Sequence, residues 1–197
     1  MKIQERVSAV LKAEARAIEN VVVGPSFEEA VRVLENCRGH VLTTGMGKAG
    51  HIAKKFAATL CSTGTPAVYV HPGEAAHGDL GVILGDAAIV AFSTSGKTRE
   101  VLEMLELGRS LGLGRVVGVT SHPDSALRDL SDVVLDMGAI EEPCPIGMTP
   151  SASIATMLAI SDALALALLE VRGFSKEDFG MRHHGGYLGH RARGEMS

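Results

Sequence analysis

Aromatic residues are scarce in this sequence, which has no Trp and draws only 4% of its 197 residues from Phe and Tyr. Cysteines are equally few. Cys37, Cys61 and Cys144 are odd in number and form no C-x-x-C pair, which argues against a disulfide framework and against a zinc ribbon. No block of basic residues is present and the formal net charge is -4, so no nucleic-acid partner is expected. We therefore expect a globular protein of a reducing compartment, the cytoplasm.

A continuous apolar run is missing from the N-terminus, because residues 1–20 alternate charged and apolar side chains. Neither a signal peptide nor a membrane anchor is expected there. A long apolar stretch lies instead at residues 151–171, with Ser161 and Asp162 near its middle. Because such side chains are costly inside a bilayer, we expect a helix buried in the core or at a subunit interface, and no membrane partner.

Five short apolar runs bounded by Gly or Pro predict parallel strands, at residues 40–44, 67–70, 87–92, 116–120 and 133–136. Their continuous rather than alternating apolar character indicates strands covered by helices on both faces. Two helices precede them, over residues 5–22 and from Ser26, where Glu29 completes a capping-box pattern. The predicted fold class is α/β: a three-layer α/β/α sandwich with a five-stranded parallel sheet, flavodoxin-like or Rossmann-like.

The length of the chain predicts a single domain over residues 1–197. We divide it into N-terminal helices (1–38), a sheet core (39–173) and a C-terminal arm (174–197). The end of the arm, from Gly180, is rich in Gly, His and Arg and has no apolar period. It is either a disordered end or an arm that orders on a partner.

The first chemically informative motif is G-M-G-K-A-G at residues 45–50, between a predicted strand and a predicted helix. Glycines let the backbone approach an anion, which the N–H groups of a helix N-terminus then stabilise. The same G-x-G-x-x-G pattern is typical of dinucleotide-binding folds, which remain an alternative. That fingerprint requires an acidic residue after the next strand, however, and here His71, Pro72 and Gly73 follow it before Glu74.

The second motif is S-T-S-G-K-T at residues 93–98, at the end of the third predicted strand. Several short hydroxyl and N–H donors at a helix N-terminus are what a phosphate ester needs. One alternative is a loop that merely caps the helix. Another is a P-loop nucleotide triphosphatase with Asp136 as magnesium ligand, although a P-loop needs Gly where Ala91 stands.

A third stretch, residues 70–81, places His71, Glu74, His77 and Asp79 in a Gly-rich loop after the second predicted strand. Loops at strand C-termini line the crevice of open α/β sheets. The spacing of the two histidines does not match a helical metal site, so no metal is expected. Acid–base chemistry suits histidine, which titrates near neutral pH. Turn formation with solvated charges is the alternative interpretation.

Longer strings occur in order from Gly45 to Gly189: G-M-G-K-A-G-H, S-T-G-T-P, H-P-G-E-A-A-H-G-D-L-G, S-T-S-G-K-T, E-E-P-C-P-I-G-M-T-P-S-A-S, R-G-F-S-K-E-D-F and H-H-G-G-Y-L-G. Together they resemble the sugar-isomerase (SIS) domain of the arabinose-5-phosphate isomerase family. The resemblance implies a homotetramer with sites at subunit boundaries. It also implies conversion of D-ribulose 5-phosphate to D-arabinose 5-phosphate for Kdo, as used in lipopolysaccharide or capsule. This proton transfer through an enediol needs no cofactor.

The resemblance also assigns residues to the site. The positions that match those the family uses at its site, and that we expect to be catalytic, are Lys48, His77, Glu142 and His183. The substrate phosphate is expected to bind Gly47, Ser93, Thr94, Ser95, Thr98 and Ser153. His71, Glu74 and Lys97 are expected to line the site. His183, in the arm, would reach the pocket of a neighbouring subunit.

Three departures from the family qualify this reading. Lys97 stands where most of the family has Glu in S-G-E, so we favour Glu142 or a His as the base. His184 replaces the usual Pro of the tail, which loosens the preset geometry of the arm. The paired cystathionine-β-synthase-type modules that often follow this domain are absent after Ser197, so no regulation through them is expected. A non-catalytic sugar-phosphate sensor, or an isomerase of another phosphosugar such as a hexulose 6-phosphate, remain alternatives.

Overall fold

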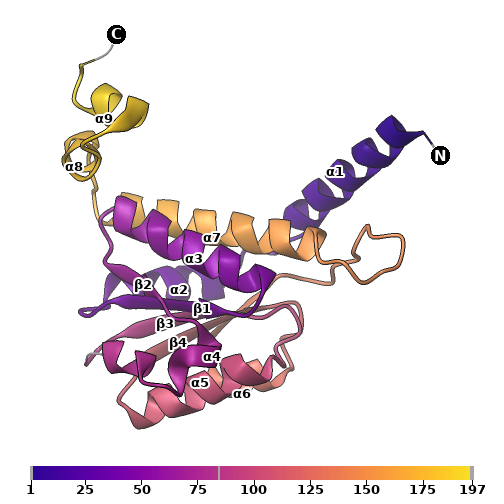
Figure 1. Cartoon of the computed structure of the whole chain (residues 1–197), viewed down its shortest axis with the longest axis horizontal. Helices are drawn as coiled ribbons and strands as arrows, with labels where there is room; N and C mark the ends of the chain where they lie inside the picture. Colours follow the sequence, from indigo (N-terminus) through magenta and orange to yellow (C-terminus); the bar gives the residue numbers. More distant parts are fainter. Residues whose placement is uncertain (1, 84, 196–197) are drawn as a thin grey trace.

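A five-stranded parallel sheet lies at the centre of the molecule (Figure 1). The computed structural model describes residues 2–83 and 85–195, so the ends of the predicted domain at 1 and 197 lie outside the described residues. The strands are β1 Val41–Gly45, β2 Ala67–Tyr69, β3 Ala88–Phe92, β4 Arg115–Thr120 and β5 Val133–Asp136. Their order is β2-β1-β3-β4-β5 and every neighbouring pair is parallel. This flavodoxin-like order reverses direction between β1 and β3, where open α/β sheets form their ligand crevice.

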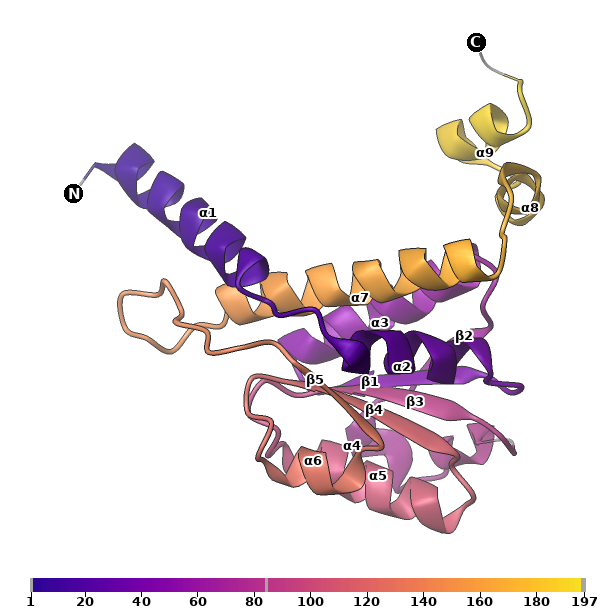
Figure 2. The same ribbon diagram turned by 180° about the vertical axis from the view of Figure 1, so that it is seen from behind.

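Helices cover both faces of the sheet (Figures 1 and 2), which confirms the predicted three-layer sandwich. On one face lie α2 Pro25–Glu35, α3 Lys48–Ser62 and α7 Ala152–Val171. On the other lie α4 Pro72–Ala75, a 3₁₀-helix at Asp79–Val82, α5 Arg99–Ser110 and α6 Ala126–Leu130. Each layer packs its own buried apolar cluster against the strands. The strands are therefore shielded from water on both sides, as their continuous apolar sequences indicate.

Three elements project from this sandwich. Helix α1, Ile3–Glu19, extends away from the body at the end where α7 begins, and the arm leaves from the end of α7 (Figures 1 and 2). The arm contains α8 Lys176–Arg182 and α9 Gly186–Ala192, so its described part is helical rather than disordered. Phe174 anchors its root, because a Cβ on Gly64 would lie only 2.6 Å from the Phe174 ring.

The predicted helix starts are partly wrong. Ser26 does not cap α2: the helix begins one residue earlier at Pro25, with Gly24 as N-cap and no side-chain cap. Proline is preorganised for the first position of a helix, and this overrides the Ser-Glu pattern. The first helix also begins and ends earlier than predicted, at Ile3–Glu19 instead of 5–22.

Helix α7 combines the length and apolar composition of a membrane span with a place in the core. It is the one helix in residues 2–83 and 85–195 that passes this test, and half of its most apolar window is buried inside the protein. Its outward Asp162 pairs with Lys55 of α3. The prediction of a core helix is thus confirmed, while burial at a subunit interface stays a prediction.

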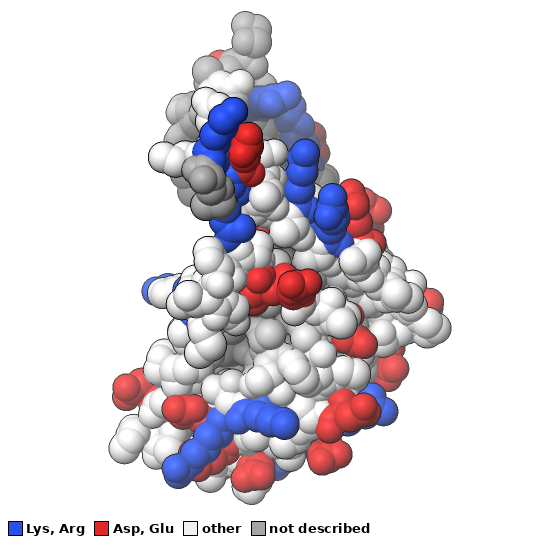
Figure 3. Space-filling view, turned by 90° about the vertical axis from the view of Figure 1, so that its right-hand side faces the viewer, with Lys and Arg blue, Asp and Glu red and all other residues white. Residues whose placement is uncertain are grey.

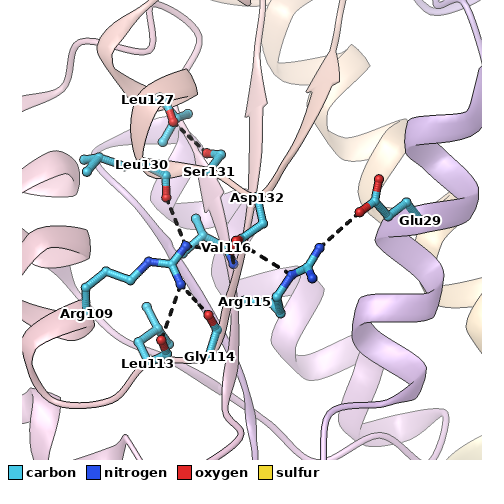
Figure 4. Close-up of polar contacts among 10 residues, drawn as sticks. All are labelled: Glu29, Arg109, Leu113, Gly114, Arg115, Val116, Leu127, Leu130, Ser131 and Asp132. Carbon is cyan, nitrogen blue, oxygen red and sulfur yellow. Dashed lines mark hydrogen bonds and ion pairs between the residues drawn. The ribbon is translucent and has the colours of Figure 1, made fainter.

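An ion-pair network fastens the amino ends of β4 and β5 (Figure 4). The Asp132 carboxylate accepts hydrogen bonds from Arg109 Nη2 and the Val116 N–H, each at 2.6 Å, and Arg115 links it onward to Glu29 of α2. Partial burial raises the pKa of Asp132, but the Val116 N–H and the two arginines outweigh this and hold the pKa below its ordinary value. This network joins both helical layers at the edge opposite the strand C-termini.

Candidate active site

The motifs singled out in the sequence meet at the carboxyl edge of the sheet. Helices α3 and α7 run in the same direction, because Lys55 pairs with Asp162 near their middles and Gly64, after α3, lies beside Phe174, after α7. Both therefore present their N-termini to this edge (Figure 1). The N-terminus of α5 follows β3 at the same edge. Figure 3 looks onto this side, which is mostly uncharged, with acidic side chains near its middle and basic ones above and below.

The β1–α3 turn is shaped by glycines. Gly47 is the N-cap of α3 with φ +59°, a conformation that favours glycine, and it brings no side chain to the helix end. A Cβ on Gly50 would lie 2.5 Å from the Gly45 carbonyl oxygen, so only glycine allows α3 to pack this closely on β1. Gly47 and Lys48, the first residue of α3, are exposed at the edge, as a binding role requires.

The Ser93–Thr98 loop follows β3, directly beside this turn, since β1 and β3 are neighbours. Ser93 is buried, and its Oγ lies 2.8 Å from Thr98 Oγ1. Ser95 and Lys97 are exposed, and the Lys97 N–H donates to Ser95 Oγ at 3.2 Å. Hydroxyls and N–H groups thus converge before α5, which begins at Arg99 with no side-chain cap. This is the arrangement that a phosphate ester can occupy.

The loop after β4 supports this loop from the side, and the sequence reasoning missed it. The Thr94 carbonyl accepts hydrogen bonds from Thr120 Oγ1 at 3.1 Å, the Ser121 N–H at 3.0 Å and His122 Nδ1 at 2.9 Å. Because a carbonyl only accepts, His122 carries its proton on Nδ1. The rule that loops at strand C-termini line the crevice would have indicated Ser121 and His122, since this strand was predicted.

Glu142 lies at the N-terminus of α7. Its Oε2 accepts the N–H groups of Ser151 at 2.7 Å and Ala152 at 2.8 Å, and its Oε1 accepts that of Ser153 at 3.2 Å. Partial burial raises the Glu142 pKa, but these three N–H groups outweigh it, and the pKa lies below its ordinary value. Ser153 itself is buried, and its Oγ has no hydrogen-bond partner among the described residues.

Replacing Glu142 by Gln is expected to lower the free energy of unfolding by about 1 kcal/mol at pH 7, because the charge at the helix N-terminus is lost. The native pKa is depressed, so the stabilisation is present above the unfolded-state pKa of about 4.3 and is lost as pH falls through the native pKa. Urea unfolding from pH 7 to about 3 should show the two proteins converging in acid. Glu141→Gln is the control, and a difference independent of pH would contradict this assignment.

Cys144 carries an unusually acidic thiol two residues beyond Glu142. The hydroxyl and N–H of Thr149, with the N–H groups of Ile146 and Met148, lower its pKa to about 6. At pH 6 we expect iodoacetamide to alkylate Cys144 roughly 10-fold faster than a thiol of the urea-unfolded chain, because the gain in thiolate outweighs the loss of nucleophilicity. Mass spectrometry of quenched samples measures both rates, and equal rates would contradict the thiolate.

The residues predicted to line the site from the segment after β2 lie in different places in the structure. His71 caps α4, accepting the Gly73 N–H on Nδ1 at 3.2 Å, and stacks edge-on against Tyr69. Glu74 lies within α4 and is exposed. His77 lines a groove of about 530 Å³ between α4 and α5, on the opposite layer from α3. The sequence reasoning treated this stretch as one loop, but α4 turns its side chains in different directions.

The predicted catalytic His183 lies far from this edge in its own chain, at the end of the molecule where α7 stops (Figures 1 and 2). Its ring stacks on Phe179, with centroids 3.7 Å apart, and its Nδ1 donates to the Phe179 carbonyl at 2.9 Å. The other ring nitrogen, Nε2, has no hydrogen bond to any residue that the structure describes, and the imidazole is held in one orientation. The structure brings Lys48, Glu142 and the Ser93–Thr98 loop to one edge, and places His183 elsewhere.

No group of three His, Cys, Asp or Glu side chains within residues 2–83 and 85–195 is placed to hold a metal ion. The expected absence of a metal and of a cofactor stays a prediction.

Comparison with known proteins decides the family. The sequence profile of the SIS domain matches residues 34–167. The chain belongs to the SIS domain family. This SIS domain is similar to the arabinose 5-phosphate isomerase KdsD of Pseudomonas aeruginosa, with 44% identity over 180 residues, or 90% of this chain and 55% of that protein. The chain therefore spans about half the length of such relatives.

Solved structures agree. A candidate phosphosugar isomerase involved in capsule formation from Bacteroides fragilis matches with a TM-score of 0.90 at 41% identity, covering 94% of this chain and all 100% of that one. A protein of Escherichia coli CFT073 in complex with arabinose 5-phosphate matches with a TM-score of 0.86 at 36% identity, covering 93% and 100%. The predicted fold class and the resemblance to the SIS domain of arabinose-5-phosphate isomerases are confirmed.

Proposed function

We propose that this SIS domain is an aldose–ketose isomerase that converts D-ribulose 5-phosphate to D-arabinose 5-phosphate, for Kdo in lipopolysaccharide or capsule. This proposal rests on one observation: Lys48, Glu142 and the Ser93–Thr98 loop all lie at the carboxyl edge of the sheet, where the crevice forms. The similarity to KdsD and to the protein solved with arabinose 5-phosphate supports the same substrate class.

The reaction moves a proton between adjacent carbons through an enediol, so a base and an oxygen-stabilising cation must flank the substrate. The Lys48 ammonium group offsets the charge that develops on the enediolate oxygen. Glu142 Oε1 accepts a single N–H, whereas Oε2 accepts two, so Oε1 keeps a lone pair for a proton. The Ser93–Thr98 loop holds the phosphate, and Lys97 adds positive charge beside it.

We further propose that the protein acts as a homotetramer in the cytoplasm. Lys48 begins α3 and His183 ends α8, and α8 lies beyond the end of α3 remote from Lys48 (Figure 1), so we expect His183 Nε2 to serve the site of a neighbouring subunit. The three free cysteines suit a reducing compartment.

The decisive assay mixes pure protein with D-ribulose 5-phosphate and follows D-arabinose 5-phosphate by NMR. We expect product to accumulate, with slower conversion of a hexulose 6-phosphate under the same conditions. No product, where a related enzyme turns over, would defeat the proposal. Faster conversion of the six-carbon substrate would reassign the enzyme to another phosphosugar.

A non-catalytic sugar-phosphate sensor is the second candidate, and the cation at Lys97, exposed beside Ser95, favours it. A sensor predicts ligand-dependent melting without turnover, and a Lys97→Glu variant that gains turnover. The isomerase predicts turnover in the natural chain. Assaying both proteins on the same substrate panel separates the two functions.

A further inference from the structure

The hydroxyl group of Tyr69 holds a backbone carbonyl at the start of the candidate active site. Tyr69 Oη, on β2, donates to the Gly45 carbonyl of β1 at 3.2 Å. Gly45 is the last residue of β1 and is buried, and Lys48 begins α3 three residues later. Partial burial raises the pKa of Tyr69, so the hydroxyl stays protonated and able to donate near neutral pH. The contact therefore joins β2 to the turn that carries Lys48.

The pairing of β1 with β2 leaves this carbonyl without a backbone donor. The Thr43 carbonyl accepts the Val70 N–H at 3.0 Å, and because backbone groups alternate in direction along a strand, the Gly45 carbonyl also faces the β2 side. The next donor in this parallel ladder would be residue 72, which is a proline and has no N–H. The Tyr69 hydroxyl takes the place of the missing donor.

The close packing of α3 on β1 makes room for this contact. A Cβ on Gly50, in the first turn of α3, would lie 2.5 Å from the Gly45 carbonyl oxygen and 2.9 Å from Tyr69 Oη. Glycine at this position thus lets the hydroxyl, the carbonyl and the helix meet. Because Gly45 is buried, water does not replace the hydroxyl, and removing it leaves an unpaired carbonyl.

An unpaired carbonyl at this point disturbs the position of Lys48. A buried backbone acceptor without a donor is costly, so the turn shifts to bring the Gly45 carbonyl to water. The turn passes through Gly47 at φ +59°, and no side chain caps α3 to resist such a shift. The Lys48 ammonium group would move with the first turn of the helix.

We propose that Tyr69 is a positioning residue for Lys48: its hydroxyl fixes the Gly45 carbonyl and thereby the turn between β1 and α3. Tyr69 acts through this turn and not on the reacting carbons. The inference rests on the proposed function, in which Lys48 stabilises the enediolate. It names the side chain that holds this cation in place.

Kinetics of Tyr69→Phe on D-ribulose 5-phosphate test the role. The change removes only the hydroxyl and is expected to lower kcat roughly 10-fold at similar KM, because a displaced cation stabilises the transition state less. Thr43→Val is the matched control, since Thr43 Oγ1 donates to the Ala53 carbonyl at 2.8 Å, also between β1 and α3 but well beyond Lys48. Both changes should lower the free energy of unfolding, and only Tyr69→Phe should lower kcat.

A double-mutant cycle separates positioning from a general loss of structure. In the Lys48→Ala background, Tyr69→Phe should lower kcat by less than about twofold, because the group that it positions is gone. The same proportional loss in both backgrounds would overturn the proposal. An unchanged kcat in Tyr69→Phe, or a similar loss in Thr43→Val, would overturn it as well.

Hydrogen exchange reports on the turn independently of turnover. The Gly50 N–H donates to the Met46 carbonyl at 3.4 Å and the His51 N–H to that of Gly47 at 3.2 Å, so both amides exchange when the turn opens. Mass spectrometry of a peptide that covers them should show exchange roughly 10-fold faster in Tyr69→Phe than in the control. Equal exchange would contradict the positioning role. An inactive natural chain with faster exchange in Tyr69→Phe would contradict the proposed reaction and leave Tyr69 as the residue that holds the turn.

Discussion

Replacing Lys48 by Ala is expected to lower kcat for the isomerisation by roughly 100-fold or more, with little change in the free energy of unfolding. Lys48 is an exposed residue at the first position of α3, so its side chain contributes little packing. Its ammonium group meets charge that exists only once the enediolate forms, and such an interaction lowers the barrier rather than KM. NMR rates and urea unfolding measure the two quantities.

Lys54→Ala is the matched control, because Lys54 is exposed on the same helix six residues further on. It should retain nearly full turnover. Equal proportional losses of turnover and of unfolding free energy in the Lys48 variant would indicate a structural role and contradict the assignment.

Replacing Gly96 by Ala is expected to lower the free energy of unfolding by about 3 kcal/mol and to weaken phosphate binding. Gly96 has φ +61°, and a Cβ there would lie 1.7 Å from Ser125 Oγ and 2.6 Å from Ser125 Cβ. Rotation can move the Ser125 Oγ but not the Ser125 Cβ, which is fixed to the backbone, so the Ser93–Thr98 loop must move instead. Urea unfolding gives the first quantity, and calorimetric titration with inorganic phosphate gives the second.

Gly112→Ala separates backbone strain from crowding. Gly112 also has a positive φ, +90°, but a Cβ at this position would meet nothing within 4 Å, so a loss of only about 1 kcal/mol is expected. Equal losses at both glycines would show that the contact with Ser125 does not restrain the phosphate loop.

The sheet was predictable because buried parallel strands appear as continuous apolar runs, and the predicted run 133–136 coincides with β5. The crevice residues after β1 and β3 could be predicted as well, because ligands of open α/β sheets bind at the carboxyl ends of the strands. The start of α8 could have been predicted, because Ser175 and Asp178 form a capping box, but the order of the rest of the arm comes from contacts without a sequence period. Arg193 donates to the His183 carbonyl at 2.8 Å, and Phe174 packs on distant Gly64.

The sequence predicted which residues belong to the site better than it predicted what each residue does there. Glu142 was expected as a catalytic carboxylate, but its bonds to N–H groups nine to eleven residues away depend on how the intervening loop returns to α7. His71 and His77 are close in sequence, yet α4 gives one a capping role and places the other in a separate groove. The spacing of residues along the sequence does not indicate in which direction each side chain will point.

The contacts around Asp132 bind strands and helices at the end of the sheet remote from Lys48 (Figure 4). This part of the resistance to unfolding therefore depends on the end of the strands opposite the candidate site. Loops at the carboxyl ends can change, as Lys97 in place of the family's Glu illustrates, without loosening the contacts around Asp132. Because these two parts of the fold are separate, the loops can change to accept other sugar phosphates while the strands and helices keep their arrangement.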